Sequence, residues 1–150
     1  MTPNDNTDYI QGIIDNLYTV LDNYKDYIGC VGISKTDDSF IPRYPFITIE
    51  LENSTEDWKE MPRRKTITAN FNITYYHANI NDKNVRVGVR SGLSKICNVL
   101  RENWDLNSYC KDLGAVVNSS TPYVLAKGTD IVAGGVVVLE ANKVISVTFS

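Results

Sequence analysis

Few residues of this 150-residue chain have types and spacing that would support a reaction. Glu50 and Glu52 lie two apart in a segment that alternates polar and apolar residues, so a strand would place both carboxylates on one face. Paired carboxylates in a cleft perform acid–base catalysis. On an exposed strand the same spacing is typical of charges that face solvent, and we predict this second role.

His77 is the only histidine, and no second metal ligand lies at zinc-site spacing from it. No serine or cysteine is placed beside it as a nucleophile, so we expect a structural histidine that is hydrogen-bonded or faces solvent. The chain also lacks the phosphate-binding glycine motifs, G-x-S-x-G and H-E-x-x-H. We therefore expect a protein that is not an enzyme and uses no metal or cofactor.

The three cysteines are Cys30, Cys97 and Cys110, with no C-x-x-C motif among them. One disulfide plus a free thiol fits this odd number, but reduced cysteines of a cytoplasmic protein are the expectation. Cys97 lies on the apolar stripe of an expected helix, so we predict that it is in the core.

The charge balance argues against a protein that grips nucleic acid. The net charge is -3 and the isoelectric point about 5.1, whereas nucleic-acid surfaces need clustered basic residues. Tyr75, Tyr76 and Trp58 are of the type that stacks on single-stranded bases, but too few basic residues surround them. The longest apolar run, residues 136–139, is far too short to span a membrane, and the N-terminal MTPNDNTD lacks the pattern of a signal peptide.

Residues 65–78, KTITANFNITYYHA, form the clearest strand of the sequence. Alternation in a strand sends successive side chains to opposite faces, and burying each large apolar side chain is worth roughly 1.5–3 kcal/mol. We predict a central antiparallel strand with one buried and one polar face. The expected buried residues are Ile67, Ala69, Phe71, Ile73 and Tyr75, and the expected polar ones are Thr66, Thr68, Asn70, Asn72 and Thr74.

Two amphipathic helices are expected to cover this sheet. The first has Thr7 as its N-cap, runs to about Tyr27 and stops at Gly29, because glycine suits the left-handed position past a helix end.

The second helix is capped by Asp82 and covers about residues 85–104. Gly88 and Gly92 weaken it, which indicates close packing at both positions. A solvated, weakly basic flank is expected from Arg86, Arg90, Lys95 and Arg101.

Residues 44–52 form a second strand, and residues 53–64, NSTEDWKEMPRR, are expected to be a long loop of the resulting hairpin. Hairpin loops usually have two to five residues. An aromatic residue and a methionine among charges resemble an interface anchor with a polar rim, so we predict contact with another chain, the alternative being that Trp58 folds back on its own domain. The interface candidates are Trp58, Lys59, Glu60, Met61, Arg63 and Arg64.

The C-terminal third is expected to add strands. Residues 115–126 form a strand interrupted near Pro122, and adjacent glycines suggest a bend within residues 131–139. Residues 143–149 either continue that strand or form a hairpin with it, and residues 30–34 form a short strand or a connector.

These elements predict one α+β domain over residues 1–150. The expected architecture is a two-layer sandwich, with a mixed or antiparallel sheet of about four or five strands and two long helices packed on one face.

The order of elements resembles the tail terminator and tail completion proteins of long-tailed bacteriophages. The resemblance covers nearly the whole chain and rests on YPFITIELEN, the charged loop, KTITANFNITYYHA, the helix VRVGVRSGLSKICNVLREN and the glycine-containing final β region. It carries no signature motif, so no functional residue is transferred from it.

The resemblance implies a structural virion protein that forms a ring, typically a hexamer, at the head-proximal end of the tail tube. Such a ring stops tube growth, joins the tail to the head connector, and lets DNA pass without specific binding. The expected partners are further copies, the tail tube protein and the connector or neck protein, and the expected location is the virion after assembly in the host cytoplasm. The alternatives are another neck or tail-tube subunit, or a small ligand-binding or enzymatic domain.

Overall fold

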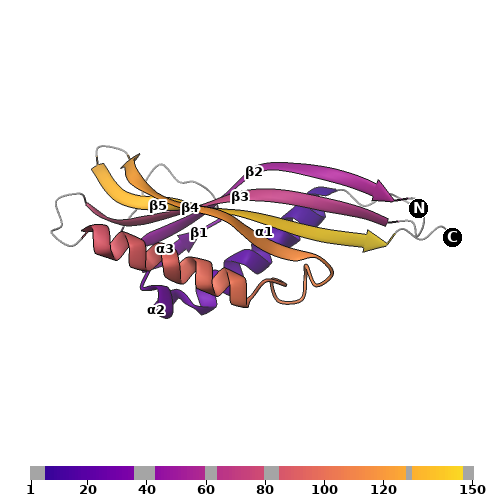
Figure 1. Cartoon of the computed structure of the whole chain (residues 1–150), viewed down its shortest axis with the longest axis horizontal. Helices are drawn as coiled ribbons and strands as arrows, with labels where there is room; N and C mark the ends of the chain where they lie inside the picture. The colour runs from indigo at the N-terminus through magenta and orange to yellow at the C-terminus, as the bar shows by residue number, and fades with distance from the viewer. Residues whose placement is uncertain (1–5, 36–42, 60–63, 80–84, 128–129, 147–150) are drawn as a thin grey trace.

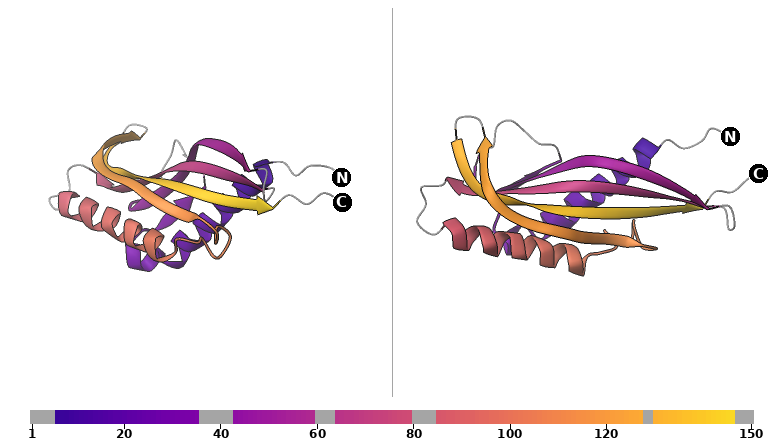
Figure 2. Two further views of the ribbon diagram at one scale, coloured as in Figure 1. Left: turned by 45° about the vertical axis from the view of Figure 1, so that its right-hand side comes forward. Right: turned by 45° about the horizontal axis from the view of Figure 1, so that its top comes forward.

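One sheet covered on a single face by helices forms the body of the protein (Figure 1). The computed structural model describes residues 6–35, 43–59, 64–79, 85–127 and 130–146. The predicted fold class is confirmed, and both long helices lie on the same side of the five-stranded sheet (Figure 2). The elements are α1 (Asn6–Asn23), α2 (Lys25–Ile28), β1 (Gly32–Ser34), β2 (Phe46–Lys59), β3 (Arg64–Asn79), α3 (Val85–Glu102), β4 (Gly114–Lys127) and β5 (Asp130–Ser146).

The strand order is β1-β2-β3-β5-β4, with β1 parallel to β2 and every other neighbouring pair antiparallel. The central strand is confirmed as β3, where Phe71 lies between Leu51 of β2 and Leu139 of β5. β5 is one long strand, because β3 offers it a continuous partner as far as Ser146.

β4 runs through Pro122 without the predicted interruption, and its register shift lies instead between Val117 and Ser119. Pro122 is tolerated because β4 is an edge strand, where a missing N–H leaves no ladder bond unmade on the outer side. Gly135 stands opposite Pro122, and a Cβ there would meet Leu93 and the Thr121 carbonyl oxygen, so glycine lets α3 and β4 approach β5 closely.

The core lies between the helices and β3, as the alternation predicted. All five inward residues of β3 are buried, and α1 contributes Ile13, Leu17, Val20 and Leu21. Cys97 is also buried.

The first helix differs from the prediction at both ends. It begins at Asn6, so Thr7 lies within its first turn rather than at the N-cap, and it pauses at Tyr24 before α2. Gly29 ends α2 in the left-handed conformation, with φ 87°, as expected. The predicted cap Asp82 lies outside the described residues.

The two glycines of α3 allow the close packing that the sequence predicted. A Cβ on Gly92 would collide with the Tyr75 ring, and one on Gly88 would collide with the His77 ring. Small residues at these two positions therefore let α3 lie directly against the end of β3.

The face of the sheet without helices is more buried than the expected wet surface. Thr66, Thr68, Asn70 and Asn72 are half-buried, whereas Thr48 and Thr74 are buried. Tyr76 and Val132 form a second small cluster with Tyr44 and Phe46. Farther along the same face, Thr68 donates a hydrogen bond to Asn142 at 2.8 Å and Asn70 donates one to Asn53 at 2.7 Å.

Candidate subunit interface

The predicted loop over residues 53–64 is wrong, because most of it is strand. β2 continues to Lys59 and β3 begins at Arg64, so Trp58 pairs with Lys65 and Lys59 with Arg64. We call residues 51–59 and 64–71 the outer hairpin. Together with β5 it continues well beyond the end of α3 (Figures 1 and 2).

A register shift between Leu51 and Asn53 sets the orientation of the outer hairpin. Glu52 is the extra residue, so the alternation of faces reverses after it. Directly paired residues share a face, and Lys65 has the parity of the buried β3 residues. Trp58 therefore lies on the helix-covered side of the sheet, and its side chain is 53% exposed.

Lys65 joins the outer hairpin to the first turn of α1. Its Nζ donates a hydrogen bond to Asn6 Oδ1 at 2.7 Å and pairs with Glu56 Oε1 at 3.5 Å. The ammonium also lies over the rings of Tyr9 and Trp58, 5.8 and 5.4 Å from their centroids. Asn6 completes the cluster by donating to Glu56 Oε2 at 2.9 Å. Trp58 thus touches its own chain on one side while much of its indole stays accessible.

The other predicted interface residues divide into two groups. Lys59 and Arg64 are exposed at the end of the hairpin, on the sheet face opposite to Trp58. Glu60, Met61 and Arg63 lie outside the described residues. Lys59 and Arg64 line a cavity of about 310 Å³ together with Thr66, Asp112, Leu113 and Val144.

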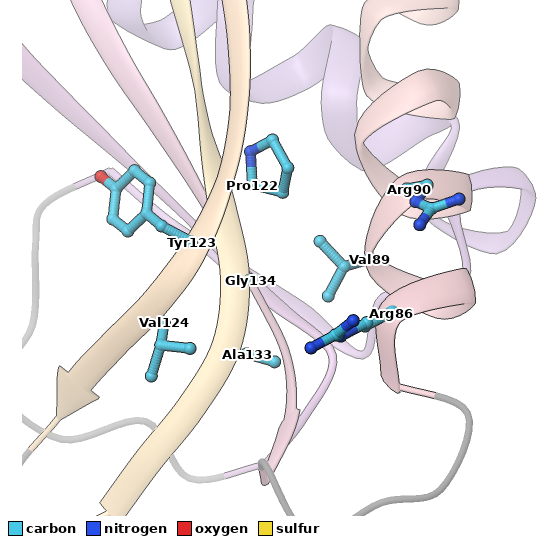
Figure 3. A pocket seen from close by; sticks show the side chains of 8 residues that line it. All are labelled: Arg86, Val89, Arg90, Pro122, Tyr123, Val124, Ala133 and Gly134. Carbon is cyan, nitrogen blue, oxygen red and sulfur yellow. The ribbon is translucent and has the colours of Figure 1, made fainter.

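A second cavity, of about 240 Å³, lies between the start of α3 and the paired strands β4 and β5 (Figure 3). Val89 and Pro122 face one another across it, and the exposed side chains of Arg86 and Arg90 stand on the α3 side. Tyr123, Val124, Ala133 and Gly134 complete the lining. We call this the arginine cavity. The sequence placed both arginines on a solvated helix flank, and only the packing of α3 on β4 reveals the apolar wall beside them.

Tyr75 and His77 contact one another at the end of β3. Tyr75 Oη and His77 Nδ1 share a hydrogen bond of 2.8 Å, so His77 is hydrogen-bonded, which is one of its two expected surroundings. Burial raises the pKa of Tyr75 to about 12, and the phenol stays protonated at neutral pH. Glu50 and Glu52 are exposed, which agrees with charges that face solvent.

The three cysteine side chains lie in the interior. Cys30, Cys97 and Cys110 are all free and buried. Burial raises the pKa of Cys30, and it raises that of Cys110 to about 11, so both remain thiols at neutral pH. Within the described part of the chain, no group of three or more His, Cys, Asp or Glu side chains is arranged to hold a metal ion.

No protein-family model matches this chain, and no curated protein matches its sequence. Among the described helices, none is both long and apolar enough to cross a membrane.

Proposed function

We propose that this protein is a structural subunit that assembles with copies of itself into a ring. In this role it acts as a tail terminator or completion protein at the head-proximal end of a phage tail tube. There it stops tube growth and joins the tail to the head connector, as a component of the virion.

The observation that carries the proposal is the exposure of the outer hairpin. Every β2 side chain from Leu51 to Lys59 is exposed, including the indole of Trp58 near the end of the hairpin. Tryptophan is enriched among the few residues that contribute most binding energy at protein interfaces. A long pair of strands that ends in such a residue is suited to reach a neighbouring subunit.

A ring requires two unlike surfaces on each subunit, because head-to-tail contacts close only when one surface fits a different one on the next copy. The projecting hairpin supplies one surface, and it lies at the opposite end of the sheet from the start of α3 (Figure 1). The net charge of -3 suits a ring through which DNA passes without a strong grip on its phosphates.

The test is the mass of the purified protein in solution, measured by light scattering and by analytical ultracentrifugation. We expect a defined oligomer that appears as a closed ring by electron microscopy. Trp58→Ala should weaken assembly by roughly 30-fold or more, since truncating such an interface residue costs about 2 kcal/mol or more.

Tyr27→Ala is the matched control, because Tyr27 is an aromatic residue of similar exposure, at 49%, but lies in α2 rather than on the hairpin or β4. This variant should assemble like the wild type. A monomeric wild-type protein at every concentration would contradict the proposal. Open stacks of indefinite length would favour a tail-tube subunit instead.

A further inference from the structure

We propose that the receiving surface for a neighbouring copy is β4 with the arginine cavity, and that the outer part of β2 from the next copy docks there. The inference rests on the proposed self-assembly and names its two contacting surfaces. It follows from three features: two unpaired sheet edges, the acidic residues of one edge and the arginines beside the other, and the side of the sheet on which the cavity opens.

Both edges of the sheet present backbone that no described strand pairs. β1 covers β2 only from Phe46 to Thr48, so residues 49–59 form a free edge. β4 is the strand at the other edge, and its side chains over residues 118–124 are all exposed. Long free edges are templates for pairing with another chain, unless charges or proline blunt them. Pro122 contributes no N–H, and no described strand pairs the outer side of β4.

The free edge of β2 is acidic, and two arginines of α3 lie beside the free edge of β4. The free part of β2 holds Glu50, Glu52, Glu56 and Asp57, all of them exposed. The described side chains of β4, residues 114–124, are uncharged, and the nearest cationic groups of the cavity are Arg86 and Arg90. Among the described residues, neither arginine forms an ion pair, and of the four acidic residues only Glu56 does. The acidic edge of one copy therefore complements the arginine-flanked edge of another.

Strand direction and side-chain orientation agree with this pairing. β2 and β4 run antiparallel to one another within the subunit, because three antiparallel pairings separate them. In a cyclic ring all copies share one orientation, so β2 of one copy meets β4 of the next as an antiparallel pair. If the sheet continues across this contact, the helix-covered faces of the two copies lie on the same side of it.

Apolar groups then meet on that side. Leu51 lies between Glu50 and Glu52, has the parity of the buried Ile49, and is 37% exposed. The arginine cavity opens between α3 and β4, on the same helix-covered side (Figure 3). An incoming Leu51 would pack against Val89 and Pro122. Glu50 pairs with Asn72 and so points to the face without helices, which leaves Glu52, the residue at the register shift, as the nearest carboxylate for the two guanidinium groups. We take Leu51 as the apolar anchor of this contact.

Charge reversal on each surface tests the proposal. The variant E50R/E52R places arginines at both surfaces, and R86E/R90E places glutamates at both. Each alone should weaken self-association at least tenfold, because like charges would meet. An equimolar mixture of the two should restore assembly as alternating oligomers, and the fourfold variant should assemble by itself. The control R101E/K111E makes the same change in net charge as R86E/R90E, but at exposed positions outside the cavity. It should assemble like the wild type.

Mass and thermal unfolding of every variant are measured in the same buffer, so that a folding defect is recognised separately. If the wild type assembles and neither double variant weakens it, or the mixture fails to recover, the inference is wrong and the proposed function stands. If the wild type stays monomeric, the proposed function fails as well. Self-association of the wild type should also fall at roughly 1 M salt, where the Debye length is about 3 Å.

Discussion

Gly92→Ala is the sharpest test of how α3 is seated on the sheet. A Cβ at position 92 would meet the Tyr75 ring, whose Oη lies 2.6 Å from the position that this atom would take. Tyr75 is 2% exposed and its hydroxyl is bound to His77, so the ring has little room to retreat. The added methyl group must therefore lift α3 away from β3 or displace a packed aromatic ring.

Two opposing terms decide the size of the effect. Alanine is up to about 1 kcal/mol better than glycine in a helix interior. Overpacking a dense core costs about 1–3 kcal/mol. We expect the clash to dominate, with a net loss of about 1–2 kcal/mol in the free energy of unfolding. For a domain of this size that loss lowers the melting temperature by roughly 2–8 °C.

Urea unfolding followed by circular dichroism measures the change, and Ser91→Ala is the control. Ser91 is exposed on the same helix, so alanine there should leave stability equal or slightly higher. In a Tyr75→Leu background the ring is absent, and Gly92→Ala should become neutral or stabilising. A Gly92→Ala protein as stable as the wild type would refute the close seating of α3 on Tyr75.

Two further predictions concern the hairpin cluster and the buried thiol. Lys65→Met should cost about 1–2 kcal/mol, because it leaves Glu56 and Asn6 without their cationic partner, and it should speed hydrogen exchange in the first turn of α1. Lys59→Met, at an exposed position, should change stability by less than about 0.5 kcal/mol. Stability should fall as pH rises from 9 toward 11, because burial raises the pKa of Cys110 from 9.0 to about 11 and the folded state holds that proton more tightly. The Cys110 contribution, on the order of 2–3 kcal/mol, is complete below pH 9, and urea titrations of Cys110→Ala should show a shallower decline.

The sequence predicted those parts of the fold in which local pattern and tertiary packing agree. The alternation of β3 predicted its buried face, because a central strand has partner strands on both sides and the helices cover one of its faces. Gly88 and Gly92 predicted close packing, because glycine destabilises a helix interior and is expected there where a neighbouring element leaves no room for a side chain. Gly29 predicted a helix end, because the left-handed backbone conformation past a helix end favours glycine.

The candidate site could not be predicted in the same way, because its features depend on pairing between distant segments. Residues 53–59 are charged and polar, so they lack the apolar alternation of a half-buried strand, and their β-structure depends on the partner β3. Arg86 and Arg90 look like solvated charges until α3 packs beside β4. Likewise, the burial of Tyr76 with Val132 requires β3 and β5 to be neighbours.

A single inserted residue, Glu52, connects the failed loop prediction with the proposed interface. If β2 alternated without a register shift, Trp58 would lie on the face without helices. The shift at Glu52 reverses the parity, so Leu51 and Trp58 both lie on the helix-covered side. The arginine cavity opens on that same side of the opposite edge. The same bulge interrupts the alternation by which the strand could be predicted from the sequence. It also places Leu51 and Trp58 on the side where the arginine cavity of a neighbouring copy would offer apolar contacts.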